Sequence, residues 1–590
     1  MERTYVIIVG AGPSGLALAL ALAHQQVKCI LLEANLDICE DPRAIAIAGD
    51  THRILQLLGI NQEKMKSFGQ PLPSINIHRH SFTAKPFLTI NYDKDWLQQG
   101  LANGTTVFQP KLEQSLRDLV NASDYADLRT ECQVLSCRPS EEGVEATYDN
   151  KGTTHQLKGA FLVGADGKRG TVRKDFLEPF GIKQEYGIHE YEATWIAANL
   201  RVNAPTPESH PKFPLWNQGF KSDELWDLFW PSGFHFCNHP TMPVAAGRFG
   251  PVNERLWRFE YELPQGQMPP NLNEDLQKQL ERHLTIQPGY YRGKLITSPV
   301  VFPWDCVEIM RCQPALFAHK VVNRWFDNRT ILIGDAAHVF PPFGAQGIAN
   351  GVRDAIALSW RIALMIRLKS GAEIPTRSNR LLYVWSQERR KGVNDSSVET
   401  MRNGALMRNK SWIVATVLGI LNGYVGVPDG FFQANAHGGS KTAQIWVKAT
   451  SGSILLTDEL FWKPKSIFTL LIVSPIKQNE AEELELMLEA ADLPPNILAH
   501  EIPEIRFKGS SSSDYPTSKR ILQYTVCELS DLEEERIHVF PGYDHTSFRN
   551  RLRTEARYVL IRPDFVIYSQ ASTLKQLVGQ LQIAKDMLAT

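Results

Sequence analysis

The stretch that decides the fold is Tyr5-Val-Ile-Ile-Val-Gly-Ala-Gly-Pro-Ser-Gly-Leu16, close to the start of the chain. Its apolar run predicts a strand that is buried on both faces of a parallel sheet. Gly10, Gly12 and Gly15 follow, where side chains would block a tight turn and the approach of backbone N–H groups to a pyrophosphate. The helix that begins there offers unpaired donors and a partial positive charge. The stretch therefore predicts a dinucleotide site.

The next strand supports this interpretation. Residues 27–33 form a second apolar run, which ends at Glu33. A carboxylate about 20 residues after the glycines can accept hydrogen bonds from an adenosine ribose. A chance glycine-rich turn is the alternative, but the order of strand, turn, helix and strand favours the dinucleotide.

A second half of the site lies far along the chain. Residues 330–334 predict another buried strand, and Asp335 follows it at the sheet edge where such folds bind ligands. Its carboxylate can accept hydrogen bonds from a polyol. Pro341 and Pro342 stiffen the next segment, and Gly344-Ala-Gln-Gly347-Ile348 begins a helix predicted over 347–368. The two halves together predict FAD, held by a chain that leaves its binding domain and returns, and we interpret His338 as a packing residue.

The remaining pattern predicts a mixed α/β protein with further domains. Alternating aromatic segments at 194–202 and 256–263 are typical of antiparallel strands. Strands are also predicted at 467–473 and 556–567, and helices at 480–491 and 574–588. We predict four segments: the first part of a Rossmann-like FAD-binding domain, an inserted antiparallel-sheet substrate domain, the return to the FAD-binding domain with a helical linker, and a C-terminal domain, over residues 1–186, 187–300, 301–440 and 441–590.

Composition excludes several classes of function. The formal net charge is −1, with 63 basic and 64 acidic residues, which does not favour nucleic acid or an anionic membrane. The eight cysteines are scattered without CxxC or a metal-ligand pattern, so no metal is predicted. No signal peptide is recognised, and a cytoplasmic location is expected. The apolar segment 412–427 is short for a membrane span of about 20 residues and is predicted to be a buried helix.

Three motifs give the chain a specific resemblance. They are Gly10–Gly15 with Glu33, the middle motif Gly164-Ala-Asp166-Gly167 through Arg173, and Gly334-Asp335 with Pro341-Pro342. Over about residues 4–400 the chain resembles the group A flavoprotein aromatic monooxygenases, the para-hydroxybenzoate hydroxylase class, and especially their phenol hydroxylase types. It departs from their pattern at Gly170, Ala345 and Ala48, where relatives usually carry Ser, Gly and an acidic residue.

The resemblance implies a cofactor site and a reaction. It implies non-covalent FAD, reduction by NADH or NADPH that binds transiently, and transfer of oxygen from O₂ through a flavin hydroperoxide to a phenolic or polyketide-like aromatic substrate. Asp166 is similar to a residue that serves both FAD and the nicotinamide. The C-terminal unit resembles a thioredoxin-like domain without CxxC. The residues expected at FAD are Gly10, Gly12, Gly15, Glu33, Arg43, Gln109, Asp166, Asp335, Pro342, Gly347 and Ile348.

Several alternatives stay open from the sequence. The same flavin chemistry could insert oxygen into a ketone, a Baeyer–Villiger outcome, and a non-catalytic flavin-binding interaction protein is a more remote alternative. The choice between NADH and NADPH, the substrate and an expected homodimer are also open. The catalytic group is unassigned, with Asp50, His235 and Arg248 as weak candidates. Core packing is the alternative role for the predicted pocket walls, which are Trp226, Phe229, Trp230, Phe234, His235, Phe236 and Arg248.

Overall fold

The chain is described here as a computed structural model. The backbone is described for residues 1–41, 43–140, 143–238, 242–264, 266–367, 374–409, 439–494, 497–507 and 517–589, with four further residues at 411, 413, 414 and 417. The predicted helix at 412–427 lies almost entirely outside the described residues. Among the described helices, none is long and apolar enough to cross a membrane.

The N-terminal strand lies inside an eight-stranded sheet, called here the central sheet. Strand β1 (Glu2–Val9) pairs in parallel with β2 (Cys29–Leu32) on one side and with β11 (Thr153–Gly164) on the other. Strand β22 (Thr330–Leu332) pairs in parallel with β11, so the chain does return to this sheet. The remaining strands are β8 (Ala126–Arg129), β9 (Cys132–Ser140), β10 (Gly143–Asn150) and β21 (Phe326–Asp327).

The register of the central sheet gathers the predicted motifs. Val9 is level with Leu32 and Gly164, and Gly164 is level with Leu332. The carboxyl ends of parallel strands meet at one edge of a sheet, which is where ligands of such folds bind. The turns that follow these strands therefore lie side by side, and they carry Gly10, Glu33, Asp166 and Asp335.

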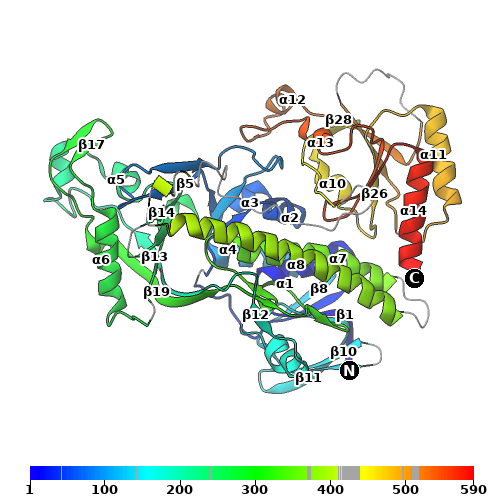
Figure 1. Ribbon diagram of the computed structural model, residues 1–590, viewed down its shortest axis with the longest axis horizontal. Coiled ribbons are helices and arrows are strands. Elements are labelled where there is room, and N and C mark those ends of the chain that lie inside the picture. The colour runs from blue at the N-terminus through cyan, green and yellow to red at the C-terminus, as the bar shows by residue number, and fades with distance from the viewer. Residues whose placement is uncertain are drawn as a thin grey trace.

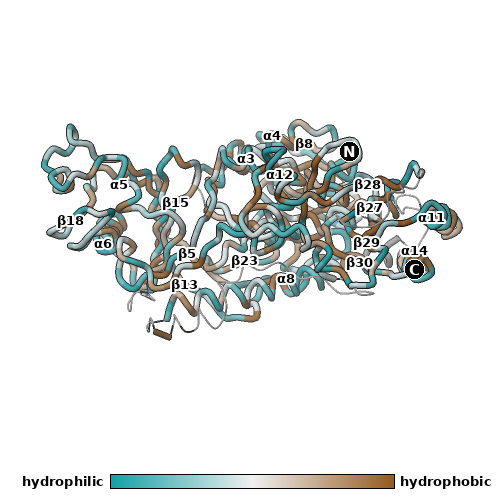
Figure 2. Tube along the Cα trace, turned by 90° about the horizontal axis from the view of Figure 1, so that it is seen from above, coloured by the Kyte–Doolittle hydropathy of each residue, from teal (hydrophilic) through white to brown (hydrophobic). Residues whose placement is uncertain are grey.

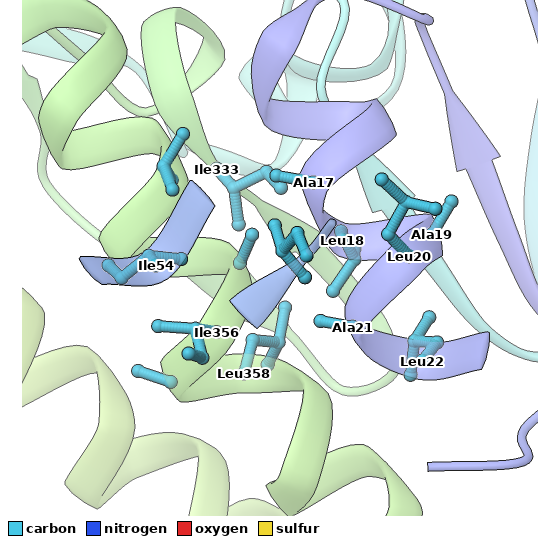
Figure 3. Close-up of a cluster of buried hydrophobic side chains, with 14 of the residues drawn as sticks. Ala17, Leu18, Ala19, Leu20, Ala21, Leu22, Ile54, Ile333, Ile356 and Leu358 are labelled. Atoms are coloured by element: carbon cyan, nitrogen blue, oxygen red, sulfur yellow. The ribbon is translucent and has the colours of Figure 1, made fainter. Parts of the chain in front are cut away.

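Helix α1 (Pro13–His24) packs against α7 (Gln346–Arg367) beside the central sheet. Figure 3 shows Ala17, Leu18 and Ala21 of α1 on the side of Ile333, Ile356 and Leu358, whereas Ala19, Leu20 and Leu22 lie toward the other side of the helix. A helix that is apolar all round is a buried helix, and residues 16–19, 21 and 22 are fully buried. This core fixes the starts of both helices at the same sheet edge.

A second sheet, with seven strands, lies in the left half of Figure 1. It is called here the middle sheet, because most of its strands come from the middle of the sequence. The segment 187–300 predicted for it is too short, because strands from 74–91 and 307–318 also belong to it. The pair at 74–91 lies far before the predicted segment in the sequence, whereas the strand at 307–318 follows it closely. In sheet order the strands are β19 (Val307–Ala318), β13 (Glu192–Val202), β16 (Leu256–Glu262), β15 (Val244–Phe249), β14 (Phe234–Cys237), β5 (Ser74–His78) and β6 (Leu88–Asn91).

The two faces of the middle sheet have different neighbours. On its outer face, Ile196, Ala246 and Phe259 pack with α5 (Ser222–Phe229) and α6 (Leu272–Leu284). On its inner face, a second cluster joins the strands to Phe343 and to the end of α8 (Ile374–Met407), the long helix that crosses the molecule in Figure 1. The inner-face cluster contains Trp195, Phe236, Ala245, Ile75, Ile77, Tyr191, Phe343, Leu406 and Met407.

Short elements complete the first 410 residues. The helices are α2 (Thr51–Leu57), α3 (Gln62–Lys66) and α4 (Gln109–Asn121). The small sheets contain β3 (Ala46–Ala48), β4 (Gly69–Pro71) and β7 (Gly104–Val107), then β12 (Gln184–Tyr186), β20 (Lys320–Val322) and β23 (His338–Val339), then β17 (Gly289–Tyr291) and β18 (Lys294–Ile296).

The C-terminal domain is built on a separate seven-stranded sheet. Strand β26 (Thr469–Ile472) pairs in parallel with β27 (Ile502–Arg506) and antiparallel with β29 (Tyr558–Ile561), which pairs with β30 (Ile567–Ala571). Helix α11 (Gln478–Ala490) follows β26 and α14 (Leu574–Ala589) ends the domain, an order compatible with the thioredoxin-like unit, which stays a prediction. The other elements are β24 (Trp446–Ala449), β25 (Ile454–Leu456), β28 (Ile521–Val526), α10 (Thr457–Phe461), α12 (Leu529–Glu534) and α13 (Ser547–Asn550).

Most predicted elements of this domain agree with the structure, with one exception. The single strand predicted over 556–567 is wrong. The segment contains β29 and the first residue of β30, which form a hairpin because the chain turns at residues 562–566. Figure 2 shows hydrophobic segments along the interior strands of the domain, whereas α11 at its edge has both hydrophilic and hydrophobic parts.

Candidate cofactor site

The glycine-rich turn has three glycines with three different surroundings. Gly10 has a φ of +100°, and a Cβ there would lie 2.6 Å from the carbonyl oxygen of Ala165. A Cβ at Gly15 would overlap the carbonyl oxygen of Gly10, so this glycine lets α1 pack onto the turn. A Cβ at Gly12 would meet no protein atom within 4 Å. Gly12 caps α1 without a side chain, and its open side fits the approach of a pyrophosphate to the helix N-terminus.

Glu33 is held against this turn. Its Oε2 accepts a hydrogen bond of 2.8 Å from the N–H of Ala11, and its Oε1 accepts from the N–H and the side chain of Asn35 at 3.0 and 2.9 Å. The carboxylate is therefore fixed beside the glycine turn at the end of β2. A carboxylate in this position fits an adenosine ribose.

Asp335 is presented at the same sheet edge by an unusual turn. The turn needs Gly334 because its φ is +59°, and the Asp335 side chain that follows is exposed. Neighbouring protein atoms desolvate the carboxylate and raise its pKa, whereas the charges of His338, Lys168 and Arg43 act in the opposite direction. An exposed acceptor in a cationic surrounding suits hydroxyl groups of a ligand that also carries phosphates.

A buried network that sequence reasoning missed supports this turn. Asp354 Oδ2 accepts hydrogen bonds from the N–H of Gly334 at 2.9 Å and from His338 Nε2 at 2.8 Å. Its Oδ1 accepts from Arg389 Nε at 2.7 Å, and Asp354, His338 and Arg389 are fully buried. His338 thus has the structural role expected of it. An acidic residue on the apolar face of α7 was the signal that could have revealed Asp354.

Asp166 lies in the turn that follows β11, and its position explains why Gly170 stands where the resemblance expects Ser. Its Oδ2 accepts a hydrogen bond of 2.9 Å from the N–H of Val172, at the start of a short π-helix over Val172–Leu177. A Cβ at Gly170 would overlap the Asp166 carboxylate, so Ser does not fit there in this conformation. Burial raises the pKa of Asp166 to about 6, against hydrogen bonds from backbone N–H groups. One oxygen of this carboxylate is therefore used to hold the start of the π-helix.

The loop that carries Arg43 is held from both sides. Gln109 Oε1 accepts from the N–H of Ala44 at 2.8 Å, so the first residue of α4 fixes the loop from the central domain. On the other side, Arg258 Nη2 of the middle sheet donates to the carbonyl oxygen of Arg43 at 2.8 Å. The exposed Arg43 side chain lies close enough to Asp335 to lower its pKa. Arg43 therefore acts on the site through its charge, whereas Gln109 acts by holding the loop that carries Arg43.

The turn before α7 completes the edge. Ala345 adopts a φ of +54°, a left-handed conformation that favours glycine, at the position where the resemblance expects a second Gly. A Cβ at Gly347 would meet no protein atom within 4 Å, while Pro342 is half-buried and Ile348 is buried. The backbone of this turn is open toward the site at a helix N-terminus, which favours a carbonyl or an anionic group.

The middle sheet presents only part of the predicted pocket wall to this edge. Phe234 and Phe236 lie on the inner face. The other predicted wall residues lie on the outer side of the sheet. Those on strands point there because side chains alternate along a strand, and the others belong to α5 or directly follow it. These wall residues are Trp226, Phe229, Trp230, His235 and Arg248. The inner-face residues that were missed are Trp195, Tyr191, Phe343, Arg258 and Glu260.

The three weak catalytic candidates have structural surroundings. Arg248 donates to the carbonyl oxygen of Trp230 at 2.7 Å and pairs with Asp227 at 2.6 Å. Both oxygens of Asp50 accept from buried cations, Arg353 at 2.7 Å and Lys441. His235 Nδ1 lies 3.0 Å from His78 Nε2. Each of these three groups is therefore held by contacts with other protein groups.

The buried pair His78–His235 predicts a loss of stability in acid. Burial lowers the pKa of His78 to about 4 and that of His235 to about 3. The unfolded chain binds protons at these side chains below about pH 6.5, whereas the folded protein does not. Stability is therefore complete above that pH and falls toward pH 4, by about 1.4 kcal/mol per histidine at pH 5.5. Urea unfolding followed by tryptophan fluorescence at pH 7.5 and 5.5 measures this, and equal free energies would contradict it.

Comparisons with known proteins agree with this geometry. A family model described as an FAD binding domain matches residues 3–289 and 299–395. The chain belongs to this FAD-binding family, that of the group A aromatic hydroxylases. The match covers the glycine turn, both strands that bring the site together and α7.

Curated relatives and a solved structure extend the comparison. A probable NADH-specific resorcinol 4-hydroxylase of Rhodococcus jostii is 26% identical over 415 residues, covering 68% of this chain and 66% of the relative. A 3-(3-hydroxy-phenyl)propionate/3-hydroxycinnamic acid hydroxylase of Burkholderia cenocepacia is 26% identical over 418 residues, covering 70% and 66%. The alignment thus spans slightly less than two thirds of these relatives. Aklavinone-11 hydroxylase, solved with FAD and aklavinone, shares the fold over 99% of both chains, with a TM-score of 0.68 and 19% identity.

The residue Asp335 offers a direct test of the site. Asp335→Ala removes a hydrogen-bond acceptor for a ligand hydroxyl, at a cost of about 1–3 kcal/mol. The affinity for FAD should therefore fall about 5- to 150-fold. Titration of the apoprotein with FAD measures the change. Asp327→Ala on β21 is the control, because Asp327 pairs with Arg324 instead, and an Asp335→Ala variant with unchanged affinity would remove Asp335 from the site.

Proposed function

We propose that the protein is an FAD-dependent monooxygenase that uses NADH or NADPH and O₂ to hydroxylate a phenolic or polyketide-like aromatic compound. The observation that carries this proposal is the meeting of two surfaces. One is the sheet edge with Gly12, Glu33 and Asp335, and the other is the aromatic inner face of the middle sheet. Phe343, which lies between Pro342 and the α7 turn, packs against Trp195 with ring centroids 5.7 Å apart and so joins the two.

The residues of the edge have separate tasks in the proposed site. The N-terminus of α1 takes the pyrophosphate, and Glu33 takes the adenosine ribose. Asp335 takes a hydroxyl group of the ribityl chain, which joins the pyrophosphate to the flavin ring. The turn around Gly347 and Ile348 offers N–H groups to the flavin ring, bordered by Pro342. Gln109 holds the Arg43 loop in place, and Asp166 lies at the end of β11, where the nicotinamide would arrive. When bound, FAD supplies the chemistry of accepting hydride and activating O₂.

The inner face supplies the surroundings for an aromatic substrate. Trp195, Phe236 and Ala245 are almost fully buried and would exclude water from the space beside the bound cofactor. Phe234 and Phe236 lie 5.2 Å apart by ring centroids and can pack against an aromatic ring. Arg258 and Glu260, paired at 3.3 Å, add two buried charged groups to the same sheet. The homodimer and the cytoplasmic location stay predictions.

The test is a panel of phenols and polyketide aromatics incubated with FAD-loaded protein, NADH or NADPH, and O₂. The proposal expects one class of compound to accelerate consumption of the nicotinamide and to gain one oxygen atom as a ring hydroxyl by mass spectrometry. Phe236→Ala should weaken the response to that compound while FAD binding persists. Oxygen found in an ester or lactone would overturn the hydroxylation in favour of the Baeyer–Villiger outcome. Bound FAD without stimulation by any compound of the panel would count against an enzyme of this substrate class.

A further inference from the structure

Three side chains of the kinds that bind metal ions meet beside the outer face of the middle sheet. They are His210, Asp305 and Cys306, and their ligand atoms all lie within 4.8 Å of one another. His210 Nε2 lies 3.1 Å from Asp305 Oδ2 and 3.8 Å from Cys306 Sγ. Among the residues that the structure describes, this is the one group of three His, Cys, Asp or Glu side chains that could hold a metal ion. It is called here the outer trio.

The distances within the outer trio suit a tetrahedral zinc-type site. Zinc bonds of about 2.0–2.1 Å to nitrogen, about 2.0–2.2 Å to oxygen and about 2.3 Å to sulfur place the nitrogen about 3.4 Å from the oxygen and about 3.6 Å from the sulfur. The separations of 3.1 and 3.8 Å from His210 Nε2 differ from these values by a few tenths of an ångström. The Asp305 side chain is 76% exposed, so it can rotate toward the sulfur without disturbing the core.

A hydroxyl group and a backbone contact hold the imidazole ring in the required direction. Ser209 Oγ lies 2.9 Å from His210 Nδ1. In the tautomer that carries its proton on Nδ1, the ring donates to this oxygen, and the lone pair of Nε2 faces Asp305 and Cys306. A metal-bound histidine usually donates its other ring N–H to a neighbouring acceptor, which orients the ring. The carbonyl oxygen of His210 also accepts from Trp216 Nε1 at 2.7 Å, which fixes the backbone behind the ring.

Two short segments bring the outer trio together, and each is held by contacts of its own. Cys306 ends a 3₁₀ helix over Trp304–Cys306, directly before β19. Its carbonyl oxygen accepts from the N–H of Asn203, just after β13, at 2.8 Å. The Cys306 side chain is 6% exposed and belongs to the outer-face cluster, and its sulfur is directed at His210 Nε2. A buried thiol is therefore already aimed at the other two ligands.

A proton is the alternative link between these groups. A proton on Nε2 would join His210 to Asp305 as an ion pair and would leave the sulfur of Cys306 without a role. A proton points at one acceptor, whereas a metal ion binds nitrogen, oxygen and sulfur at once. Imidazole and thiolate ligands together favour zinc over Mg²⁺ and Ca²⁺, which prefer oxygen ligands. The approach of both Asp305 and Cys306 to the same nitrogen therefore favours a zinc-type ion.

We propose that His210, Asp305 and Cys306 form a binding site for a zinc-type divalent cation, which ties the segment around His210 to the start of β19. On binding, the cation replaces the thiol proton of Cys306, which passes to solvent. Three protein ligands leave the fourth position of a tetrahedral ion for water, which reaches it beside the exposed Asp305. The sequence predicted no metal because 95 residues separate His210 from Asp305. The inference does not depend on the proposed function.

The test uses the full-length protein, freed of metal ions with a chelator and then titrated with Zn²⁺ by calorimetry. One ion per chain is expected, counted by mass spectrometry after dialysis. The unfolding temperature should rise with Zn²⁺, because a ligand that binds the folded state stabilises it. Co²⁺ is the spectroscopic probe. The difference spectrum should contain a thiolate-to-cobalt charge-transfer band, which reports a bond to sulfur.

Two variants remove one ligand each, Cys306→Ser and His210→Ala. Changes outside the ligands already cost about 10–100-fold in metal affinity, so each variant should raise the Kd for Zn²⁺ by at least about 100-fold. Cys306→Ser should also abolish the cobalt band. Cys312→Ser is the matched control, since Cys312 is a free cysteine on β19 whose sulfur lies 3.8 Å from the carbonyl oxygen of Leu272. It should leave the Kd and the band unchanged.

The circular dichroism of each metal-free variant separates a lost site from a lost fold. If Cys306→Ser or His210→Ala does not fold, Asp305→Asn changes an exposed side chain instead and should raise the Kd by about tenfold or more. Failure of the unchanged protein to bind Zn²⁺ would overturn the inference in favour of a protonated pair of His210 and Asp305. Zinc bound equally by the unchanged protein and the folded ligand variants would overturn it in favour of adventitious binding elsewhere.

Discussion

Gly12→Val is expected to abolish measurable FAD binding while the apoprotein still folds. A Cβ at Gly12 meets no protein atom within 4 Å, so a branched side chain fits the protein itself. It fills the space through which the pyrophosphate approaches the N-terminus of α1. The affinity should fall roughly 1,000-fold, equal to about 4 kcal/mol. Titration with FAD and the unfolding temperature of the apoprotein measure the two effects separately.

The neighbouring glycine gives the opposite result and serves as the control. A Cβ at Gly15 would overlap the carbonyl oxygen of Gly10, and backbone atoms cannot move aside as the end of a side chain can. Gly15→Val should therefore be insoluble or unfolded in the absence of any ligand. A Gly12→Val variant that binds FAD normally would show that the turn is not the pyrophosphate site, and one that fails to fold would show that its open side is occupied by protein.

Asp354→Ala is expected to lower the free energy of unfolding by about 3–5 kcal/mol, the range seen when one partner of a buried ion pair is removed. The substitution strands the buried charge of Arg389 and removes the acceptor of both His338 and the N–H of Gly334. Burial raises the pKa of Asp354, but His338 and Arg389 outweigh it and hold the pKa below its usual value. The carboxylate is therefore ionised at pH 7, where urea unfolding should be measured.

A nearby carboxylate provides the comparison for this variant. Asp335→Ala removes an exposed side chain on the same turn, so its apoprotein should be within about 0.5 kcal/mol of the unchanged protein. Asp354→Asn keeps one acceptor and should lie between the two. Equal losses for Asp354→Ala and Asp335→Ala would mean that the buried network does not support the Gly334 turn.

The cofactor edge was predictable because its signals are local. A buried parallel strand, a glycine turn and a helix start are each encoded within about a dozen residues, by periodicity and by the backbone freedom of Gly. The sequence alone therefore predicts that Gly10, Glu33 and Asp335 belong to one site. Parallel strands place their carboxyl ends together, so the topology of the sheet then brought these residues side by side.

The faces of the middle sheet were not predictable from the same kind of signal. The alternation along β14 separates His235 from Phe234 and Phe236 but does not say which set faces the cofactor domain. That choice depends on α5 and α6, which cover one face, and on Phe343, which comes from another domain and lies against the other. His235 and Arg248 were expected in the pocket wall and lie instead among the helix-covered residues.

The sequence by itself determined the class of fold, the cofactor motifs and the absence of CxxC from the C-terminal domain. Tertiary structure alone decided which distant charges meet. Asp50 pairs with Arg353 across 303 residues and with Lys441 across 391, and Arg53 meets Asp458 across 405. The physical reason is that hydrophobic periodicity records how deeply a residue is buried, whereas the partner of a buried charge is set by the packing of whole domains.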